Sequence, residues 1–338
     1  MRTRISITII LAIAMIAIMY FISQRTVDQQ NGFNRGRIIS AKEPKSILRV
    51  NGRDVAYPCG ISHSHFYFQS DIPAILYSTD KNLSKLDTVR LRADLNPLYP
   101  RPKPFVCYVD SPSVTIFAGN APAILRTHLY DTSSAVVHPK VKFSRAIALG
   151  ENFYLRAFDS ALKSQELCMV SKGSLNYCLD QTAKKNDGGL LGDGLLIADR
   201  STDQLIYVHF YNNRIAVYDT GLQELKQFHS VDTFSSSQLS TVNYKNGYTA
   251  NKPKFIVQKW AAASDGLLYI CSLIKADNQS SNDFSQNTTI DVYDYGSGKY
   301  LKSIYVPNRN GHKLNTFSVY GRNLVAVYQD LIAVYLLS

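Results

Sequence analysis

The chain has 338 residues, enough for one large domain or two of ordinary size. Twenty-two Tyr and fifteen Phe accompany a single Trp, a composition that favours half-buried pleated sheets over helices. The formal net charge is +11, so a basic surface could face anionic lipid or glycan, but the Lys and Arg residues are scattered and form no dense cluster. Nucleic acid is not an expected partner, because the N-terminal segment described next predicts an exported chain.

The N-terminus carries an uncharged apolar run from Ile5 to Ile22, preceded by Arg2 and Arg4. Its length is just adequate for a membrane span, and the flanking arginines predict a cytoplasmic N-terminus with the remainder exported. No Ala-x-Ala pattern follows the run, so we predict that residues 1–25 are an uncleaved signal-anchor in the cytoplasmic membrane. A cleaved signal, leaving a secreted or periplasmic protein, is the alternative, and a buried core helix is the structural alternative.

Residues 26–46 are polar, mix Gly, Asn, Gln and Arg, and show little periodicity. This composition predicts a linker between the membrane segment and a globular domain. We therefore expect the domain to span residues 47–338.

A repeated strand organises the rest of the chain. The tetrapeptide Ile215-Ala216-Val217-Tyr218 recurs at Ile332-Ala333-Val334-Tyr335, and the variant Ile290-Asp291-Val292-Tyr293 lies between them. Such internal self-similarity predicts stacked β-units, most often the blades of a propeller. The repeated tyrosines are expected to be structural elements of a blade and not catalytic groups.

Six strand-turn-strand patterns follow one another, with anchors near residues 66, 114, 153, 206, 267 and 324. They predict an all-β protein, most simply a six-bladed β-propeller in which the last strand and an N-terminal segment share a blade and close the ring. The long gap between Ile215 and Ile290 leaves seven blades as an alternative. A pair of β-sandwiches is the other alternative, because alternation alone does not distinguish it.

Two motifs resemble the six-bladed, TolB-like propeller proteins. An Asp-Gly pair precedes an inner strand at Asp265-Gly266-Leu267-Leu268-Tyr269, and a Tyr-Asp-x-x-x-Gly turn follows a strand at Tyr293-Asp294-Tyr295-Gly296-Ser297-Gly298. The resemblance covers residues 47–338 and rests on architectural motifs. It implies the fold much more than an activity, because the superfamily includes binding scaffolds, lactonases and quinoprotein-like enzymes.

The strongest local group of metal-ligand types is Cys59, His63 and His65. An alternating His-x-His on a strand would place both imidazoles on one face, which suits a soft metal. No fourth ligand is evident, so histidines on a surface or loop beside a core strand are the competing interpretation.

Five cysteines occupy positions 59, 107, 168, 178 and 271, without zinc-finger spacing. A hairpin turn centred on Gly173 would place Cys168 opposite Cys178, and an exported compartment permits a disulfide there. Separately buried thiols are the alternative.

The segment Asp187-Gly188-Gly189-Leu190-Leu191-Gly192-Asp193-Gly194 is rich in glycine. A phosphate cradle would need a strand-to-helix junction, which the following apolar strand does not supply. Calcium binding through Asp187 and Asp193 is conceivable but lacks acidic density. A turn between blades is the favoured interpretation.

Two function classes remain open, and no cofactor is indicated. We expect a membrane-tethered, extracytoplasmic propeller that acts as a binding or scaffold module for a protein, peptide or glycan. The alternative is a propeller enzyme, hydrolase-like or lactonase-like, or a quinoprotein-like oxidoreductase, with its site at the mouth of the central channel. An enzyme should gather several acids and histidines at one end of the axis, whereas a binding module should present an aromatic or basic surface.

Overall fold

The computed structural model describes residues 13–16, 30–41, 43–99, 104–159, 164–179, 191–236, 239–243, 249–253 and 255–337, with the backbone alone at 159, 176–179, 239–243 and 249–253. Within these ranges, no helix is long and apolar enough to cross a membrane. The predicted signal-anchor from Ile5 to Ile22 falls almost wholly outside them and stays a prediction.

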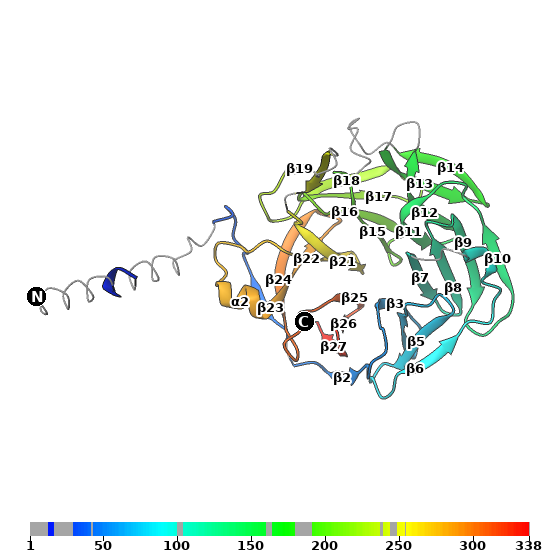
Figure 1. The fold of residues 1–338 in the computed structure, drawn as a ribbon, viewed down its shortest axis with the longest axis horizontal. Coiled ribbons are helices and arrows are strands. Elements are labelled where there is room, and N and C mark those ends of the chain that lie inside the picture. Colours follow the sequence, from blue (N-terminus) through cyan, green and yellow to red (C-terminus); the bar gives the residue numbers. More distant parts are fainter. Residues whose placement is uncertain are drawn as a thin grey trace, which may run out of the picture.

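The described part of the chain contains six antiparallel groups of four strands, numbered here units 1 to 6, arranged around a central axis (Figure 1). Units 1 and 2 contain β3 (Tyr57–Ile61), β4 (His65–Gln69), β5 (Ile75–Asp80), β6 (Asp87–Arg90), β7 (Phe105–Asp110), β8 (Ser113–Ala118), β9 (Ala123–His128) and β10 (Ser134–Val137). The inner strands of units 1 and 2, β3 and β7, also pair in parallel, which joins these two units into one eight-stranded sheet. Units 3 and 4 contain β11 (Phe143–Leu149), β12 (Asn152–Asp159), β13 (Ser164–Ser171), β14 (Ser174–Leu179), β15 (Gly194–Asp199), β16 (Gln204–His209), β17 (Arg214–Tyr218) and β18 (Glu224–His229).

Units 5 and 6 complete the arrangement and include the N-terminal strands. Their members are β21 (Gln258–Ser264), β22 (Leu267–Ser272), β23 (Asn287–Asp294), β24 (Lys299–Pro307), β25 (Thr316–Tyr320), β26 (Asn323–Val327), β27 (Leu331–Leu336) and β2 (Ser46–Arg49), with β1 (Ile38–Ser40) as a fifth strand on unit 5. The chain is therefore an all-β β-propeller, as predicted.

The first and last strands of the domain meet in unit 6. β2 pairs antiparallel with β27, so that Ile47 lies opposite Ala333 and Leu48 opposite Ile332. This pairing covers what would otherwise be an exposed strand edge and joins the two ends of the ring. The predicted closure by an N-terminal segment and the final repeat is confirmed.

All three copies of the repeated tetrapeptide occupy the third strand of their unit, namely β17, β23 and β27. Their tyrosines Tyr218, Tyr293 and Tyr335 are buried. The hydroxyl of Tyr293 accepts a hydrogen bond from the Val231 amide at 2.9 Å, and those of Tyr328 and Tyr335 bond each other at 2.9 Å. The repeated segment is thus a packing element that occupies the same strand position in units 4, 5 and 6.

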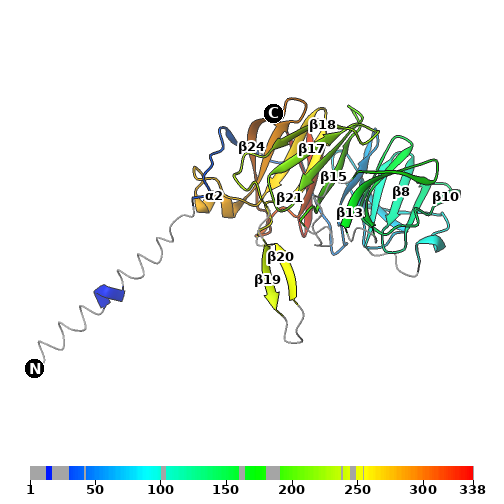
Figure 2. The same ribbon diagram turned by 90° about the horizontal axis from the view of Figure 1, so that it is seen from above.

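The long gap between the first two copies holds a hairpin and a short helix. The hairpin consists of β19 (Leu239–Asn243) and β20 (Thr249–Pro253), pairs only with itself, and projects from one face of the ring (Figure 2). The helix α2 (Ser281–Gln286) is capped by the preceding residue Ser280, whose hydroxyl accepts a hydrogen bond from the Asp283 amide at 2.9 Å. Among the described residues, these insertions account for the gap without a seventh four-stranded sheet.

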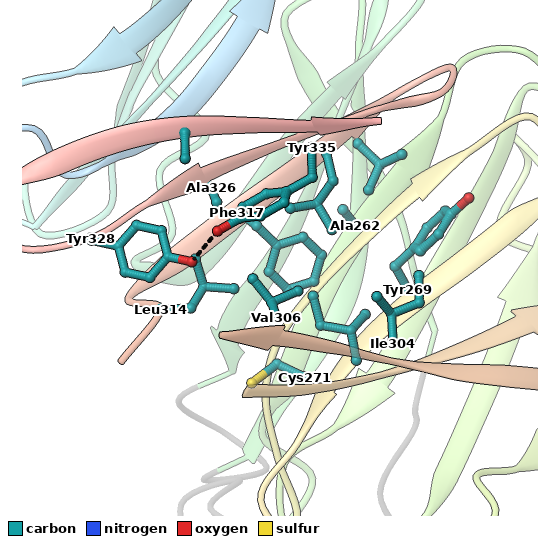
Figure 3. Close-up of a cluster of buried hydrophobic side chains, with 14 of the residues drawn as sticks. Ala262, Tyr269, Cys271, Ile304, Val306, Leu314, Phe317, Ala326, Tyr328 and Tyr335 are labelled. Carbon is teal, nitrogen blue, oxygen red and sulfur yellow. Dashed lines mark hydrogen bonds between the residues drawn. The ribbon is translucent and has the colours of Figure 1, made fainter. Parts of the chain in front are cut away.

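The hydrophobic core is divided into layers between neighbouring sheets. In the layer between units 5 and 6, buried side chains such as Ile304, Val306, Phe317 and Ala326 interdigitate (Figure 3). A single sheet cannot bury its own apolar faces, so each sheet packs against the two sheets beside it.

Candidate functional site: the central channel

A cavity of about 730 Å³ lies among the innermost strands β3, β7, β11, β15, β21 and β25, each of which contributes to its lining. These strands are the ones nearest the axis (Figure 1). Much of the lining is apolar, and small side chains such as Ala146, Ala148, Ala262 and Ala263 leave the space open. The volume lies within the range of roughly 300–1,000 Å³ that is typical of sites for small ligands.

One end of the cavity, here called the basic mouth, is formed by Arg145, Leu195, Phe210, Lys259 and Trp260. Most of these residues lie near the amino-terminal ends of inner strands, and Phe210 directly follows β16. The guanidinium of Arg145 lies over the Phe210 ring at 5.2 Å, and its Nε donates to the Gly194 carbonyl at 3.0 Å. Trp260 donates its indole N–H to the Phe317 carbonyl at 2.7 Å. The mouth therefore combines fixed aromatic rings with cations.

The opposite mouth contains Lys81, Asp199, Arg200 and Tyr320 at the carboxyl ends of the strands. Arg200 pairs with Asp110 of β7 at 2.6 Å. The Asp199 carboxylate accepts hydrogen bonds from the Ser201 amide and hydroxyl, from the Gly266 amide and from the Tyr295 hydroxyl. Although burial raises the pKa of Asp199, these hydrogen bonds outweigh it and hold that pKa below its ordinary value.

Four groups in the lining are poorly suited to ionise. Burial raises the pKa of the Cys59 thiol and of the Tyr57, Tyr108 and Tyr320 hydroxyls well above their ordinary values. A thiol or phenol of this kind stays protonated at neutral pH, so none is prepared to act as a nucleophile or as a general base.

The structure separates the residues of the predicted metal site. Cys59 is buried in β3 and lines the channel, whereas His63 is exposed in the turn that follows. His65 begins β4, and its Nδ1 lies 2.7 Å from the Ser64 hydroxyl. Across the described ranges no three His, Cys, Asp or Glu side chains are placed to hold a metal ion.

Cys168 and Cys178 face each other in the antiparallel register of β13 and β14, as the hairpin around Gly173 predicts. Cys168 is disulfide-bonded, and Cys59, Cys107 and Cys271 are free. The side chain of Cys178 lies outside the described residues, so its pairing with Cys168 stays a prediction.

The glycine-rich segment offers one described carboxylate, since Asp187 lies outside the described residues. Asp193 approaches Arg156 at 3.2 Å and Arg145 at 3.5 Å, and it also accepts the Gly194 amide at 2.9 Å. Two guanidinium groups beside this carboxylate disfavour a calcium ion there.

The most elaborate polar network lies outside the channel, where sequence reasoning found no site. Arg35, in the segment predicted as a linker, is buried and pairs with Asp291 through two hydrogen bonds of 2.7 and 2.9 Å. Its remaining donors reach the Ser272 hydroxyl at 2.9 Å, the Ile274 carbonyl at 3.2 Å and the Gln279 side chain. Such a bidentate, fully hydrogen-bonded pair is the favourable geometry for a buried ion pair.

Neighbouring contacts fasten the rest of this N-terminal segment to unit 5. The Asp277 carboxylate accepts the Asn31 and Gly32 amides at 2.7 and 3.0 Å, and Asn278 exchanges side-chain hydrogen bonds with the Arg35 backbone. β1 then pairs in parallel with β24. Described residues of the predicted linker therefore contact the propeller. The one feature of the sequence that could have pointed to this network is Asp291, the single acidic residue in the three copies of the repeated strand.

His209 is a second buried polar group outside the cavity lining. It lies at the end of β16, and neither ring nitrogen has a hydrogen-bond partner. Burial, with the Arg214 and Arg156 charges, lowers the pKa of His209 to about 3. The imidazole is therefore neutral at physiological pH.

No protein-family model matches the chain, and no curated protein matches its sequence. A solved structure of a DUF4221 family member from Bacteroides vulgatus is similar with a TM-score of 0.56 at 10% identity, over 91% of this chain and 99% of that chain. Streptogramin B lyase is similar at 0.46 and 10% identity, over 90% and 96% of the two chains, and the WD40 propeller domain of Doa1 at 0.45 and 10%, over 86% and 96%. At 10% identity, the likeness to the DUF4221 family member shows a shared fold alone.

Proposed function

We propose that the protein is a six-bladed propeller of the TolB-like kind that acts as a binding module, tethered outside the cytoplasmic membrane by its N-terminal segment, and that its channel receives a peptide segment of a partner. The observation that carries this proposal is the channel itself. It has the volume of a ligand site, an apolar wall and a few cationic and aromatic groups at its ends.

The composition of the lining supports binding over catalysis. Acid–base or nucleophilic catalysis needs titratable groups that can exchange protons near neutral pH. The described lining contains no histidine, its one carboxylate is Asp199, and that carboxylate is held by four hydrogen bonds. The thiol of Cys59 is kept protonated by burial.

The same lining favours a peptide over a glycan. Sugar hydroxyls need many hydrogen-bonding side chains, whereas aliphatic and aromatic side chains of a peptide gain from burial against apolar walls at about 25 cal/mol per Å². The half-buried side chains of Val106, Leu195, Ala198 and Ala263 supply such walls, and Asn323 is the only amide side chain in the described lining.

A peptide-display selection on the full-length protein in lipid nanodiscs tests this function. Selected peptides should bind with one-to-one stoichiometry by calorimetry and should lose at least about tenfold in affinity on Leu195→Trp, which puts an indole into the channel. Ala263→Trp is a second obstruction at another position in the lining.

Leu225→Trp is the matched control, because it adds the same indole at an exposed position of β18, outside the described lining. Thermal unfolding checks that all three variants are folded. Peptides that bind the obstructed variants as tightly as the natural chain would show that the channel is not the binding site.

A further inference from the structure

We infer that the channel selects a peptide with a carboxylate, and that this carboxylate lies at the basic mouth between Arg145 and Lys259. The inference rests on the proposed function and names the chemistry of the ligand and its orientation. It comes from a difference in charge between the two ends of the same cavity.

At the basic mouth, cations outnumber acids. Arg145 and Lys259 line the cavity, and Arg156 lies behind them, whereas Asp193 is the acid that contacts these arginines. In the described part of the chain, no carboxylate lies within ion-pair distance of Lys259, which is exposed. A positive charge therefore remains at this end for a ligand.

At the opposite mouth, the charges balance. Arg200 is paired with Asp110, and the lining there holds one further cation, Lys81, and one acid, Asp199. An anionic group entering the channel is thus attracted to one end and not to the other, which sets a direction for the ligand.

Arg145 is held ready for a carboxylate. Its stacking on Phe210 and its hydrogen bond to Gly194 fix the plane of the guanidinium. Its two terminal nitrogens have only long contacts, Nη1 with the Ser144 carbonyl at 3.4 Å and Nη2 with Asp193 at 3.5 Å. The side chain keeps 38% of its surface exposed. A guanidinium oriented in this way loses little conformational freedom when it forms charge-assisted hydrogen bonds.

The backbone around the mouth is also fixed. The Val257 amide donates to the Phe210 carbonyl at 2.7 Å, which joins the start of β21 to the end of β16. This contact connects the Phe210 segment, on which Arg145 stacks, to the strand that carries Lys259. The two cations therefore project from connected elements, and the apolar wall between Leu195 and Ala263 continues inward from them.

Calorimetry with three short peptides tests the inference, again on the full-length protein in nanodiscs with empty nanodiscs as reference. The probes are N-acetyl-Leu-Leu-Phe with a free carboxylate, the same peptide as its amide, and N-acetyl-Leu-Phe-Asp amide. The first two differ only in the terminal group, an ionised carboxylate against a neutral amide, and the third carries its carboxylate on a side chain in place of one leucine.

We expect the acid to bind at least about tenfold more tightly than its amide, since hydrogen bonds to charged groups contribute about 1.5–3 kcal/mol. Lys259→Gln should reduce that preference to about threefold or less, and Lys81→Gln, the matched control at the opposite mouth, should leave it unchanged. Binding of the third peptide at similar strength would identify an acidic side chain as an equal source of the carboxylate, and weaker binding would identify the terminus.

The inference is overturned if acid and amide bind equally, if the two lysine variants act alike, or if none of the three peptides binds. Its failure is distinguishable from that of the proposed function. If the amide peptide binds the natural chain as tightly as the acid, and this binding is lost in Leu195→Trp, the channel is a peptide site without a preference for a carboxylate. If the display selection yields no peptide that binds in the channel, the proposed function and the inference both fail.

Discussion

Two copies of the repeated strand, in units 4 and 5, differ at one inner position. Ala216 in β17 and Asp291 in β23 occupy equivalent places, and both are buried. Ala216 packs in an apolar layer with Tyr207 and Leu196. Asp291 instead receives Arg35 and, at 2.5 Å, the Ser303 hydroxyl.

The difference teaches where the N-terminal segment is fastened. A buried carboxylate is costly without a partner, and here the partner is 256 residues away along the chain. The third copy carries Ala333 at the same place, and its neighbour on the outer strand is Ile47. Of these three units, only the one with the acidic copy binds Arg35.

The largest effect is expected from Ala216→Asp, which copies the acidic variant into a layer without its partner. The new carboxyl would lie among apolar neighbours, and we expect a loss of about 4 kcal/mol or more in the free energy of unfolding. Denaturant titration followed by circular dichroism measures it. Ala216→Asn has the same shape without the charge and should lose less. Equal losses would show that volume, not charge, is decisive.

Asp291→Ala tests the other direction. Arg35 would stay buried but would have no counter-charge, and we expect the free energy of unfolding to fall by about 3–4 kcal/mol. Denaturant titration measures this change, and a lower midpoint is its first sign. Asp294→Ala, on the same strand but with an exposed turn carboxylate, is the control. A midpoint for Asp291→Ala as high as that of the control would mean that the ion pair contributes nothing.

The double variant Arg35→Met with Asp291→Ala should recover most of that loss. With both charges removed, no uncompensated charge is buried, and we expect a stability within about 2 kcal/mol of the natural chain. A double-mutant cycle with the two single variants gives the coupling energy. Additive losses in this cycle contradict a direct interaction between the two side chains.

The smallest effect at neutral pH is expected from His209→Phe, which removes a buried polar ring that lacks hydrogen bonds. At pH 7 we expect a change within about 1 kcal/mol. In acid the free energies of unfolding of the natural chain and of His209→Phe should differ. The unfolded chain takes up a proton near pH 6.5, while the folded pKa of His209 is about 3, so the natural chain loses stability as the pH falls between these values.

His209→Phe should therefore lessen the acid destabilisation by up to about 1.4 kcal/mol per pH unit in that window. Unfolding curves at pH 7, 5 and 4 for both proteins give the difference. Parallel loss of stability in the two proteins would mean that His209 is not the group responsible.

The sequence predicted the architecture well and the site poorly, for a physical reason. Alternation and the Ile-Ala-Val-Tyr copies report local strand packing, and all three copies occupy third strands as a blade repeat requires. The channel, by contrast, takes three to six residues from each of six inner strands that are far apart in the sequence. Arg145 and Lys259 are separated by more than a hundred positions, so only the closed ring gives them a common site.

The Arg35 network shows an intermediate case. Asp291 is visible in the sequence as a departure from the repeat. Its partner Arg35, however, lies in a polar segment without periodicity, so the sequence does not indicate the ion pair. The predicted ligand group of Cys59, His63 and His65 rests on close spacing along the chain alone, and in the structure Cys59 is buried while His63 is exposed.

The fastening of the N-terminal segment also determines how the domain would carry mechanical load. A pull along the chain from residue 30 reaches the Asp277 and Arg35 contacts first, then β1, and only afterwards β2. β2 is the strand whose removal would open the ring at unit 6. Under such a pull, the contacts of the N-terminal segment with unit 5 would have to break before force reached the pairing of β2 with β27 that closes the ring.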